Sequence, residues 1–483
     1  MKKENNMVKK LKYSSLAIAS AAFSITACKL PAVVEKAENK NLPASYGNSQ
    51  DTLSTAKIKW KEYFTDAYLN ALIDTALANN QELNITLQEI EMSRNEVRAR
   101  KGEYLPFVGV RAGVGADKAA KYTLQGALEE KVPIVDDKEN PKPVGDFLLG
   151  VYANWEIDIW NKLHNATKAS YNHFLASMEG RNFVVTNLIA EVANSYYELL
   201  ALDNQLEIVN KNIEILTSAL EIVKMQKEAT RVTELAVKKF EAEVLKTQSM
   251  QYDIKQQITE TENKINFLLG RYPQPIARND QAFGNLVPPA VHSGIPSQLL
   301  ANRPDIKQAE LELIAAKLDI KVAKAQFYPS LGISAAFGYQ AFNPSYFLHT
   351  PESILYSLAG DLMAPLVNRN AIKATYLNAS AKQVQAVYNY QRTIINAYVE
   401  VANQLSKIGN LEKSYDLKSK QVDALTQSID ISNALFKSAR ADYMEVLMTQ
   451  RDALESKFEL VETKKQQLNA MVNVYRALGG GWN

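Results

Sequence analysis

The feature that most constrains the fold is an internal repeat, because two halves of the chain resemble each other. Residues 76–115 align with residues 299–338 at a constant offset of 223. Further along, Glu191–Asn194 and Glu400–Asn403 are both Glu-Val-Ala-Asn and align at an offset of 209. A register of this length predicts a duplicated architecture. Each half reads as a helix, a strand, a loop, a second strand and two long helices.

The helical segments carry apolar residues at every seventh position. In the second half the series is Val401, Ile408, Tyr415, Val422, Ile429 and Phe436, and in the first half it is Val192, Leu199, Leu206, Ile213 and Leu220. An apolar residue at every seventh position over such a length indicates coiled-coil packing of long helices. An ordinary core stripe is the alternative, but residues 160–225 alone would form about 100 Å of helix, which a globular domain rarely needs. No proline interrupts 144–272 or follows Pro365.

Four other segments alternate with a period of two residues, at 108–114, 149–157, 333–341 and 354–362. Each has one apolar face and one polar or small face, as transmembrane strands do. A half-buried soluble sheet gives the same pattern. Four strands cannot enclose a water-filled lumen, and open sheet edges are not tolerated in lipid. The strands therefore form either a soluble sheet or a barrel pooled from several chains, and three chains would supply twelve strands. The polar segments 117–146 and 343–353 are expected to be exposed loops.

The N-terminus has the pattern of a bacterial lipoprotein signal. Five lysines within residues 1–12 precede an apolar run from Leu16 to Ile25, and small residues precede Cys28, the single cysteine of the chain. We predict a signal peptide over 1–27 and a lipidated tether over 28–58. A plain signal peptide with an incidental cysteine is the alternative. No later stretch has 18 consecutive apolar residues, so a membrane span of the mature chain would have to be built from strands.

Composition argues against catalysis and against a nucleic-acid partner. The net charge of +2 offers no basic surface for nucleic acid. The four histidines share no metal-ligand spacing, and one cysteine excludes an internal disulfide. No nucleophile stands beside an activating base, and no nucleotide-binding loop is present. We expect no enzymatic activity, no bound metal and no cofactor other than the covalent lipid on Cys28.

The ordered set of motifs resembles the TolC-type outer-membrane factor family, in particular its lipoprotein (RND efflux, NodT-like) branch. The resemblance runs from about Trp60 to Trp482. It rests on a set of matching residues: Trp60, Phe64, Asp66, Leu69, Leu72, Ile73, Ala76, Leu77, Asn80, Trp155–Asp158, Leu300–Asp305, Ala309, Glu310 and Phe327–Ser330.

This resemblance implies a mainly α fold with a small β part. Three chains would form a twelve-stranded transmembrane β-barrel from four strands each, and long antiparallel helices would form a periplasmic α-barrel. The two structural repeats would cover 59–269 and 297–483, joined by an equatorial linker at 270–296. Shorter helices over about 66–104 with 244–269, and over 297–327 with 453–478, would stack end to end beside the long ones.

The resemblance also implies a function as the passive outer-membrane duct of a tripartite efflux pump for drugs or other small toxic solutes. The partners would be a periplasmic adaptor, an inner-membrane RND-type transporter that supplies the energy, and outer-membrane lipid. The expected location is the outer membrane of a Gram-negative cell, with the helices in the periplasm. A type I protein-secretion duct and a coiled-coil adaptor or structural lipoprotein are the alternatives.

The helices are expected to reverse near 226–233 and 436–443, where the resemblance implies that the barrel closes. The resemblance implies a gate of acidic side chains on the second hairpin, with Glu445 at the position of a family gate aspartate, and the candidates are Glu445, Asp442 and Asp430. Three symmetric carboxylates around a narrow lumen would repel one another and favour cations. A solvated helix charge is the alternative for each of them. The candidates for tip or adaptor contacts are Arg440, Arg231, Thr230 and Ala439, and for the two arginines a plain surface position is the alternative. The last two stand where many relatives have glycine, so whether these turns keep a positive φ is open.

Overall fold

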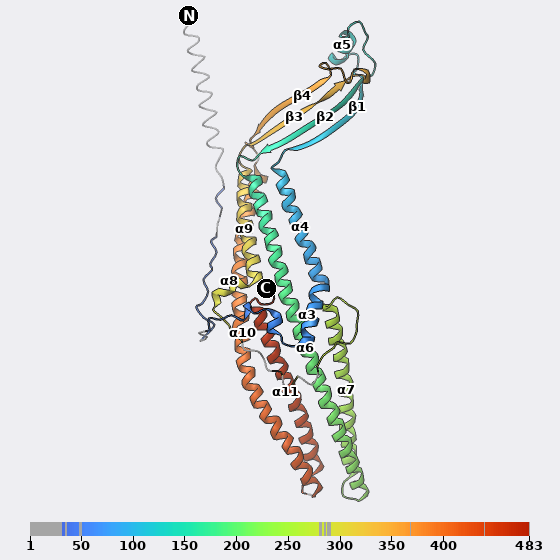
Figure 1. Ribbon diagram of the computed structural model, residues 1–483, viewed down its shortest axis with the longest axis vertical. Coiled ribbons are helices and arrows are strands. Elements are labelled where there is room, and N and C mark those ends of the chain that lie inside the picture. The colour runs from blue at the N-terminus through green and yellow to red at the C-terminus, as the bar shows by residue number, and fades with distance from the viewer. Residues whose placement is uncertain are drawn as a thin grey trace. The chain divides into compact units, whose positions relative to one another are not determined.

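The computed structural model describes residues 31–33, 36–47, 51–279, 283–284, 286, 291–367, 369–438 and 440–482 (Figure 1). The predicted signal peptide (1–27), Cys28 and Ala439 lie outside these residues. The chain divides into two compact units. The strand unit comprises residues 1–37, 92–174 and 311–387, and the hairpin unit comprises residues 38–91, 175–310 and 388–483. Among the described residues, no helix has the length and hydropathy needed to cross a bilayer.

The strand unit contains one antiparallel sheet in the order β1-β2-β3-β4. The strands are β1 (Phe107–Asp117), β2 (Val144–Ile157), β3 (Ser330–Ala341) and β4 (Ile354–Met363). All four lie where the two-residue alternation predicts them. Each repeat contributes one pair, and β2 joins β3 between the repeats, with Val151 opposite Phe337. Within the described chain, β1 and β4 each pair on one side only, so the sheet has two open edges.

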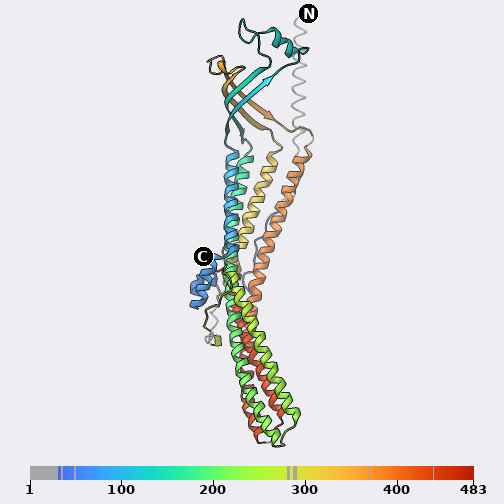
Figure 2. The same cartoon turned by 90° about the vertical axis from the view of Figure 1, so that its right-hand side faces the viewer.

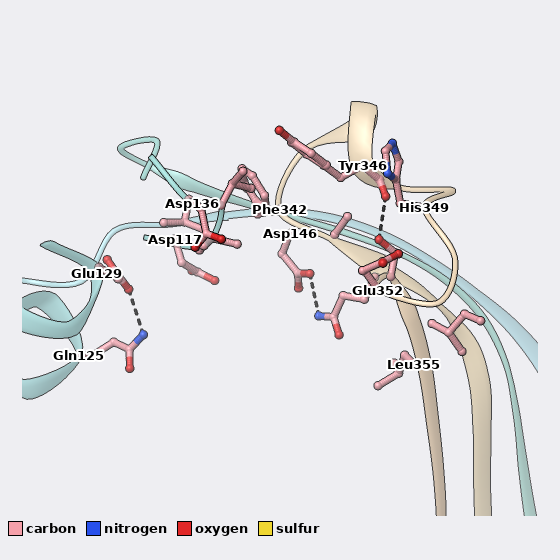
Figure 3. Close-up of a pocket in the computed structure, with 18 residues that line it drawn as sticks. Asp117, Gln125, Glu129, Asp136, Asp146, Phe342, Tyr346, His349, Glu352 and Leu355 are labelled. Atoms are coloured by element: carbon pink, nitrogen blue, oxygen red, sulfur yellow. Dashed lines mark hydrogen bonds between the residues drawn. The ribbon is translucent and has the colours of Figure 1, made fainter. Parts of the chain in front are cut away.

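The loops at one end of this sheet are more ordered than their composition suggested. The predicted loop over 117–146 contains the helix α5 (Leu124–Lys131), because the Thr123 hydroxyl accepts a hydrogen bond from the Gly126 N–H at 3.1 Å and caps the first turn. The β1–β2 and β3–β4 loops meet around a cavity of about 960 Å³ (Figure 3). Gln340 donates to Asp146 across it at 2.8 Å.

Long helices fill most of the remaining chain. The list from N- to C-terminus is η1 (Thr55–Lys57), α2 (Trp60–Tyr63), α3 (Ala67–Asn79), α4 (Gln81–Glu103), α6 (Lys162–Glu228), α7 (Glu234–Leu268), η3 (Pro296–Gln298), α8 (Leu299–Asn302), α9 (Pro304–Ala325), η4 (Pro344–Tyr346), α10 (Asn370–Lys437) and α11 (Tyr443–Ala477). The uninterrupted α6 and α10 agree with the seven-residue apolar series. The reversals after α6 and α10 fall in the segments expected from the sequence.

The short helices differ from the prediction, because two breaks were missed. The expected helix over 66–104 is α3 followed by α4. Asn80 ends the first and caps the second, since its Oδ1 accepts from the Leu83 N–H at 3.0 Å. The expected helix over 297–327 is divided into η3, α8 and α9, and Pro304 begins α9 at a position where a missing N–H costs nothing.

An aromatic core holds the centre of the hairpin unit. Tyr63 stacks on Tyr475 with ring centroids 4.2 Å apart, and both side chains are buried. The Tyr196 hydroxyl donates to Asp66 at 2.8 Å, and the same carboxylate caps α3 by accepting from Tyr68 and Leu69 N–H groups. The helices α2, α3, α6 and α11 are therefore fixed to one another by both packing and hydrogen bonds.

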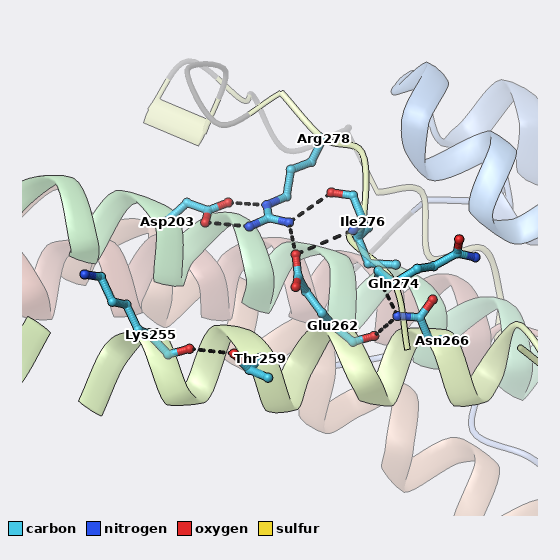
Figure 4. A network of polar contacts seen from close by, with 8 residues as sticks. All are labelled: Asp203, Lys255, Thr259, Glu262, Asn266, Gln274, Ile276 and Arg278. Atoms are coloured by element: carbon cyan, nitrogen blue, oxygen red, sulfur yellow. Dashed lines mark hydrogen bonds and ion pairs between the residues drawn. The ribbon is translucent and has the colours of Figure 1, made fainter. Parts of the chain in front are cut away.

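One arginine fastens the linker between the repeats onto the first hairpin (Figure 4). Arg278 donates to both oxygens of Asp203 on α6, at 2.5 and 2.9 Å, and to Glu262 on α7 at 2.5 Å. Burial alone would lower the pKa of Arg278, but the hydrogen bonds that it donates to the two carboxylates outweigh this effect, so the pKa lies above its usual value. The linker is thus held by a charge cluster and not by packing alone.

Candidate gate at the hairpin ends

The first reversal, between α6 and α7, closes with a left-handed residue. The Thr230 N–H donates to Lys227 O and the Arg231 N–H donates to Gln226 O, both at 2.8 Å, which is the Schellman arrangement of a helix C-terminus. Thr230 has φ +59°. The positive φ is therefore kept here without glycine, at a cost of about 1–2 kcal/mol for a residue with a Cβ.

The second reversal, between α10 and α11, shows the same long hydrogen bond. The Arg440 N–H donates to Leu435 O at 2.9 Å, across the same five-residue interval as in the first turn. Asp442 precedes α11 in extended conformation and its carbonyl accepts from the Glu445 N–H at 3.1 Å. Asp442 is therefore the N-cap residue of α11 and Glu445 lies in the first turn, so both stand at the helix N-terminus, where negative charge is favoured by the helix dipole.

An apolar cluster beneath the turns holds the two hairpin ends together. Phe240 and Val223 of the first hairpin are buried in it, and Phe436, Tyr443 and Leu447 of the second hairpin pack against it. The Lys239 ammonium group also donates to the sulfur of Met444 at 3.4 Å. Figure 2 shows the two hairpins side by side. The ends of α6, α7, α10 and α11 in one chain therefore form a single packed group.

The three gate candidates and the two candidate contact arginines are all exposed. In the described part of the chain, no ion pair involves any of these five side chains: Glu445, Asp442, Asp430, Arg440 and Arg231. The ion pair that does span the first turn joins Lys227 and Glu234. One chain therefore brings Asp442 and Glu445 together but does not assemble a ring, and the gate assignment stays a prediction.

The sequence analysis did not identify two lines of exposed carboxylates, although their seven-residue spacing is visible in the sequence. They lie at every seventh residue and at matching repeat positions: Glu207, Glu214 and Glu221 on α6, and Asp416, Asp423 and Asp430 on α10. Residues seven apart share a helix face. The first member of each line is paired four residues on, Glu207 with Lys211 and Asp416 with Lys420. Asp430 is thus the last member of an acidic line.

The sheet exposes apolar side chains along its strands. Val110 of β1 is 72% exposed, Val114 is 78% exposed, and Leu358 of β4 is 80% exposed. A water-soluble sheet would cover such a face, whereas a sheet in lipid presents it outwards.

The duplicated hairpins and this exposed sheet coincide with a family match over residues 72–271 and 295–480, which is the greater part of the chain. The chain belongs to the outer membrane efflux protein family. Membership confirms the predicted family and makes the protein a channel component of an efflux system located in the outer membrane. The predicted mainly α fold with a small β part is also confirmed.

Several relatives match over almost their whole length. The pyoverdine export outer membrane protein OpmQ of Pseudomonas aeruginosa is 26% identical over 88% of this chain and 87% of its own. The probable outer membrane lipoprotein SilC of Salmonella typhimurium is 24% identical over 98% of this chain and 99% of its own. The open-state MtrE outer membrane channel of Neisseria gonorrhoeae has a TM-score of 0.81 at 20% identity, covering 94% of this chain and 98% of that one. This efflux channel therefore shares the fold of MtrE.

Proposed function

We propose that three copies of this efflux channel form a passive duct through the outer membrane. The observation that carries the proposal is the four-stranded sheet with two open edges and an exposed apolar face. Because an unpaired edge in lipid leaves several backbone groups without hydrogen bonds, β1 of one copy would pair with β4 of the next. Three copies give twelve strands, and the closed barrel leaves no edge.

The duct would work in a tripartite pump. A periplasmic adaptor and an inner-membrane RND-type transporter would bind at the hairpin ends, where the helical turns are exposed. The transporter supplies the energy, because the chain carries no nucleotide-binding loop. Relatives are named for pyoverdine, toluene and cation efflux. The variety of these cargoes fits a duct whose partners select what is exported. We assign drugs or other small toxic solutes to the channel formed by this chain.

The gate would form where the second hairpins of three copies meet. Asp442 is the N-cap residue of α11, Glu445 lies in its first turn, and Asp430 ends the acidic line of α10. Three copies of each carboxylate around the axis would favour cations and offer acceptors that hold the end shut. Arg231 and Arg440, in the matching turns, are the donors we assign to adaptor or tip contacts.

The N-terminus would fix the channel to the membrane. Cys28 would carry the covalent lipid and begin the mature chain after removal of residues 1–27. One acyl chain gives only marginal membrane binding, so the lipid and the barrel would act together.

Conductance of single channels in planar bilayers tests both parts of the proposal. The trimer is first established by native mass spectrometry in detergent, and we expect openings from trimeric protein. E445Q removes the proposed ring charge at constant size, and we expect a larger current through the closed state and weaker cation preference. E455Q is the matched control, because Glu455 is exposed on the same helix away from the turn.

The two parts fail in different ways. Monomeric protein without conductance in bilayers rejects the duct. A conducting trimer whose closed-state current is the same in E445Q, E455Q and the unmodified protein rejects Glu445 as a gate residue and leaves the duct intact.

A further inference from the structure

An apolar cleft of about 440 Å³ opens in the strand unit where the strands pass into the helices. Its walls come from four segments: Ile159 and Trp160 after β2, Tyr328 after α9, Ala364 after β4, and Ile372 on α10. Ile159 and Trp160 are each close to half-exposed. The volume is in the range of sites for small organic molecules, about 300–1,000 Å³.

One wall of the cleft is rigid. The Trp160 indole stacks on Tyr328 with ring centroids 4.8 Å apart, and its N–H donates to Pro329 O at 2.7 Å. Lys162 forms an ion pair with Glu156 among the lining residues. The cleft therefore has a fixed aromatic wall and a paired charge, a combination suited to a ligand with a long apolar part and a polar end.

The N-terminal segment of the chain leads to this cleft. Val33 packs against the cluster of Ile320, Phe327 and Tyr376, and Ile372, which lines the cleft, packs against the same cluster. Three residues after Val33, the Gln383 side chain binds the backbone of Lys36. Its amide donates to Lys36 O at 2.9 Å and its oxygen accepts from Lys36 N–H at 3.5 Å. Gln383 is 2% exposed, so this contact is built into the packing of α10.

The distance from Val33 to the chain's own lipid is short. Cys28 lies five residues before Val33, and an extended chain spans at most about 3.5 Å per residue, so the sulfur of Cys28 stays within about 17–20 Å of this cluster. An acyl chain held at that distance has a high effective concentration at the cleft compared with bulk lipid.

We propose that the cleft binds one acyl chain of the lipid on Cys28, so that the anchor docks on the protein where the strands end. The inference rests on the lipidation of Cys28 given under Proposed function. The apolar walls would contact the methylene groups of the chain in place of the surrounding lipid. The segment bound by Gln383 then sets the height at which the channel sits in the membrane.

Photochemical crosslinking of the full-length protein tests this docking. Cells are fed a diazirine fatty acid, membranes are irradiated, and digested protein is examined by mass spectrometry. We expect a crosslink within one chain, from the lipopeptide that begins at Cys28 to peptides that line the cleft. A364W fills the cleft from an exposed position and is expected to lower this crosslink severalfold. V367W, at an 87% exposed position that does not line the cleft, is the matched control.

A second variant tests the segment that delivers the lipid. Q383L removes both contacts to Lys36 and is expected to lower the crosslink with the cleft unaltered. Crosslinks to free phospholipid alone, or from the lipopeptide only to outward residues of β4, would overturn the proposal. The intact mass of the purified protein is measured first, because a chain without acyl groups refutes the lipidation and the docking with it, whereas an acylated chain without the crosslink refutes the docking alone.

Discussion

The two repeats end their last helices with the same backbone but with different chemistry. Gly270 follows α7 with φ +68°, and Gly479 follows α11 with φ +89°. A Cβ at these positions would lie 2.4 Å from Asn79 O and 2.5 Å from Asn302 O, respectively. In both repeats the final helix therefore turns against the same carbonyl of the neighbouring helix, and only glycine fits.

The side chain that secures each junction is different. Asn80 donates to Leu268 O at 2.9 Å in the first repeat. At the matching position Arg303 donates to Ala477 O at 2.8 Å, and it also binds Asp305 and Glu400. Burial alone would lower the pKa of Arg303, but these carboxylates outweigh it and the pKa lies above its usual value. The two repeats thus share the contact between glycine and the helix carbonyl. The first repeat secures it with a neutral amide, and the second with a buried cation that binds two carboxylates.

The largest effect is expected from removing that cation. R303M keeps a long apolar side chain but leaves Asp305, Glu400 and Ala477 O without their donor, and should lower the free energy of unfolding by about 3–5 kcal/mol. Thermal unfolding of the detergent-solubilised protein, followed by circular dichroism, measures the loss. R303K retains the charge without the planar guanidinium group, so its free energy of unfolding should lie between those of R303M and the unmodified protein. If R303M lowers the free energy of unfolding by no more than about 1–2 kcal/mol, as expected for the loss of a neutral helix cap, the ion pairs of Arg303 contribute little.

The shared backbone predicts equal effects at the two glycines. G270A and G479A each force a Cβ against a carbonyl and a residue into a left-handed conformation, so each should cost about 2–3 kcal/mol. The same unfolding experiment applies, with G409A on α10 as the control, because nothing lies within 4 Å of a Cβ at that helical position. A difference of more than about 1 kcal/mol between the two variants would mean that the junctions are not equivalent.

The neutral junction should be the weaker of the two. N80A removes the bond to Leu268 O and the cap of α4, and should cost about 1–2 kcal/mol. N80D separates the two parts, since it keeps an acceptor for the Leu83 N–H but loses the donor to Leu268 O. If N80D unfolds like the unmodified protein, the cap matters and the interhelical bond does not.

Local patterns explain which parts of this fold could be predicted. The seven-residue series extends without interruption through α6 and α10, so both helices and both reversals follow from it. The helix α5 was missed because its polar composition hides the cap at Thr123. The contacts of Arg303 and Gln383 could not be predicted, because each joins segments that are far apart in the sequence.

The candidate gate was predictable only in part, for a different physical reason. The expected reversal at 436–443 is observed, with Asp442 as the N-cap residue of α11 and Glu445 in its first turn. The proposed ring of carboxylates, however, would need more than one chain, and no pattern within one chain states which face of a helix would meet a symmetry axis. The acidic lines on α6 and α10 were readable from the repeat offset and the seven-residue spacing together.

The smallest expected effect concerns another matched pair, His173 on α6 and Lys382 on α10. His173 Nδ1 lies 2.9 Å from Glu312, and this hydrogen bond, opposed by burial and aided by the charges of Glu312 and Asp319, raises the pKa of His173 above 6.5. A raised pKa means that the stabilisation is complete below about pH 6.5 and is lost as the pH rises through the folded-state value. The advantage of the unmodified protein over H173Q should therefore be present at about pH 6 and absent at about pH 8.5.

The side chains of His173 and Glu312 are both close to half-exposed, so their interaction should contribute a few tenths of a kcal/mol to the free energy of unfolding. H173K gives the first repeat the residue that the second already has. Because a lysine keeps its charge across this range, H173K should abolish the pH dependence while retaining the partner. A pH-dependent difference that persists in H173K would assign the titration to another group and remove His173 from the comparison of the repeats.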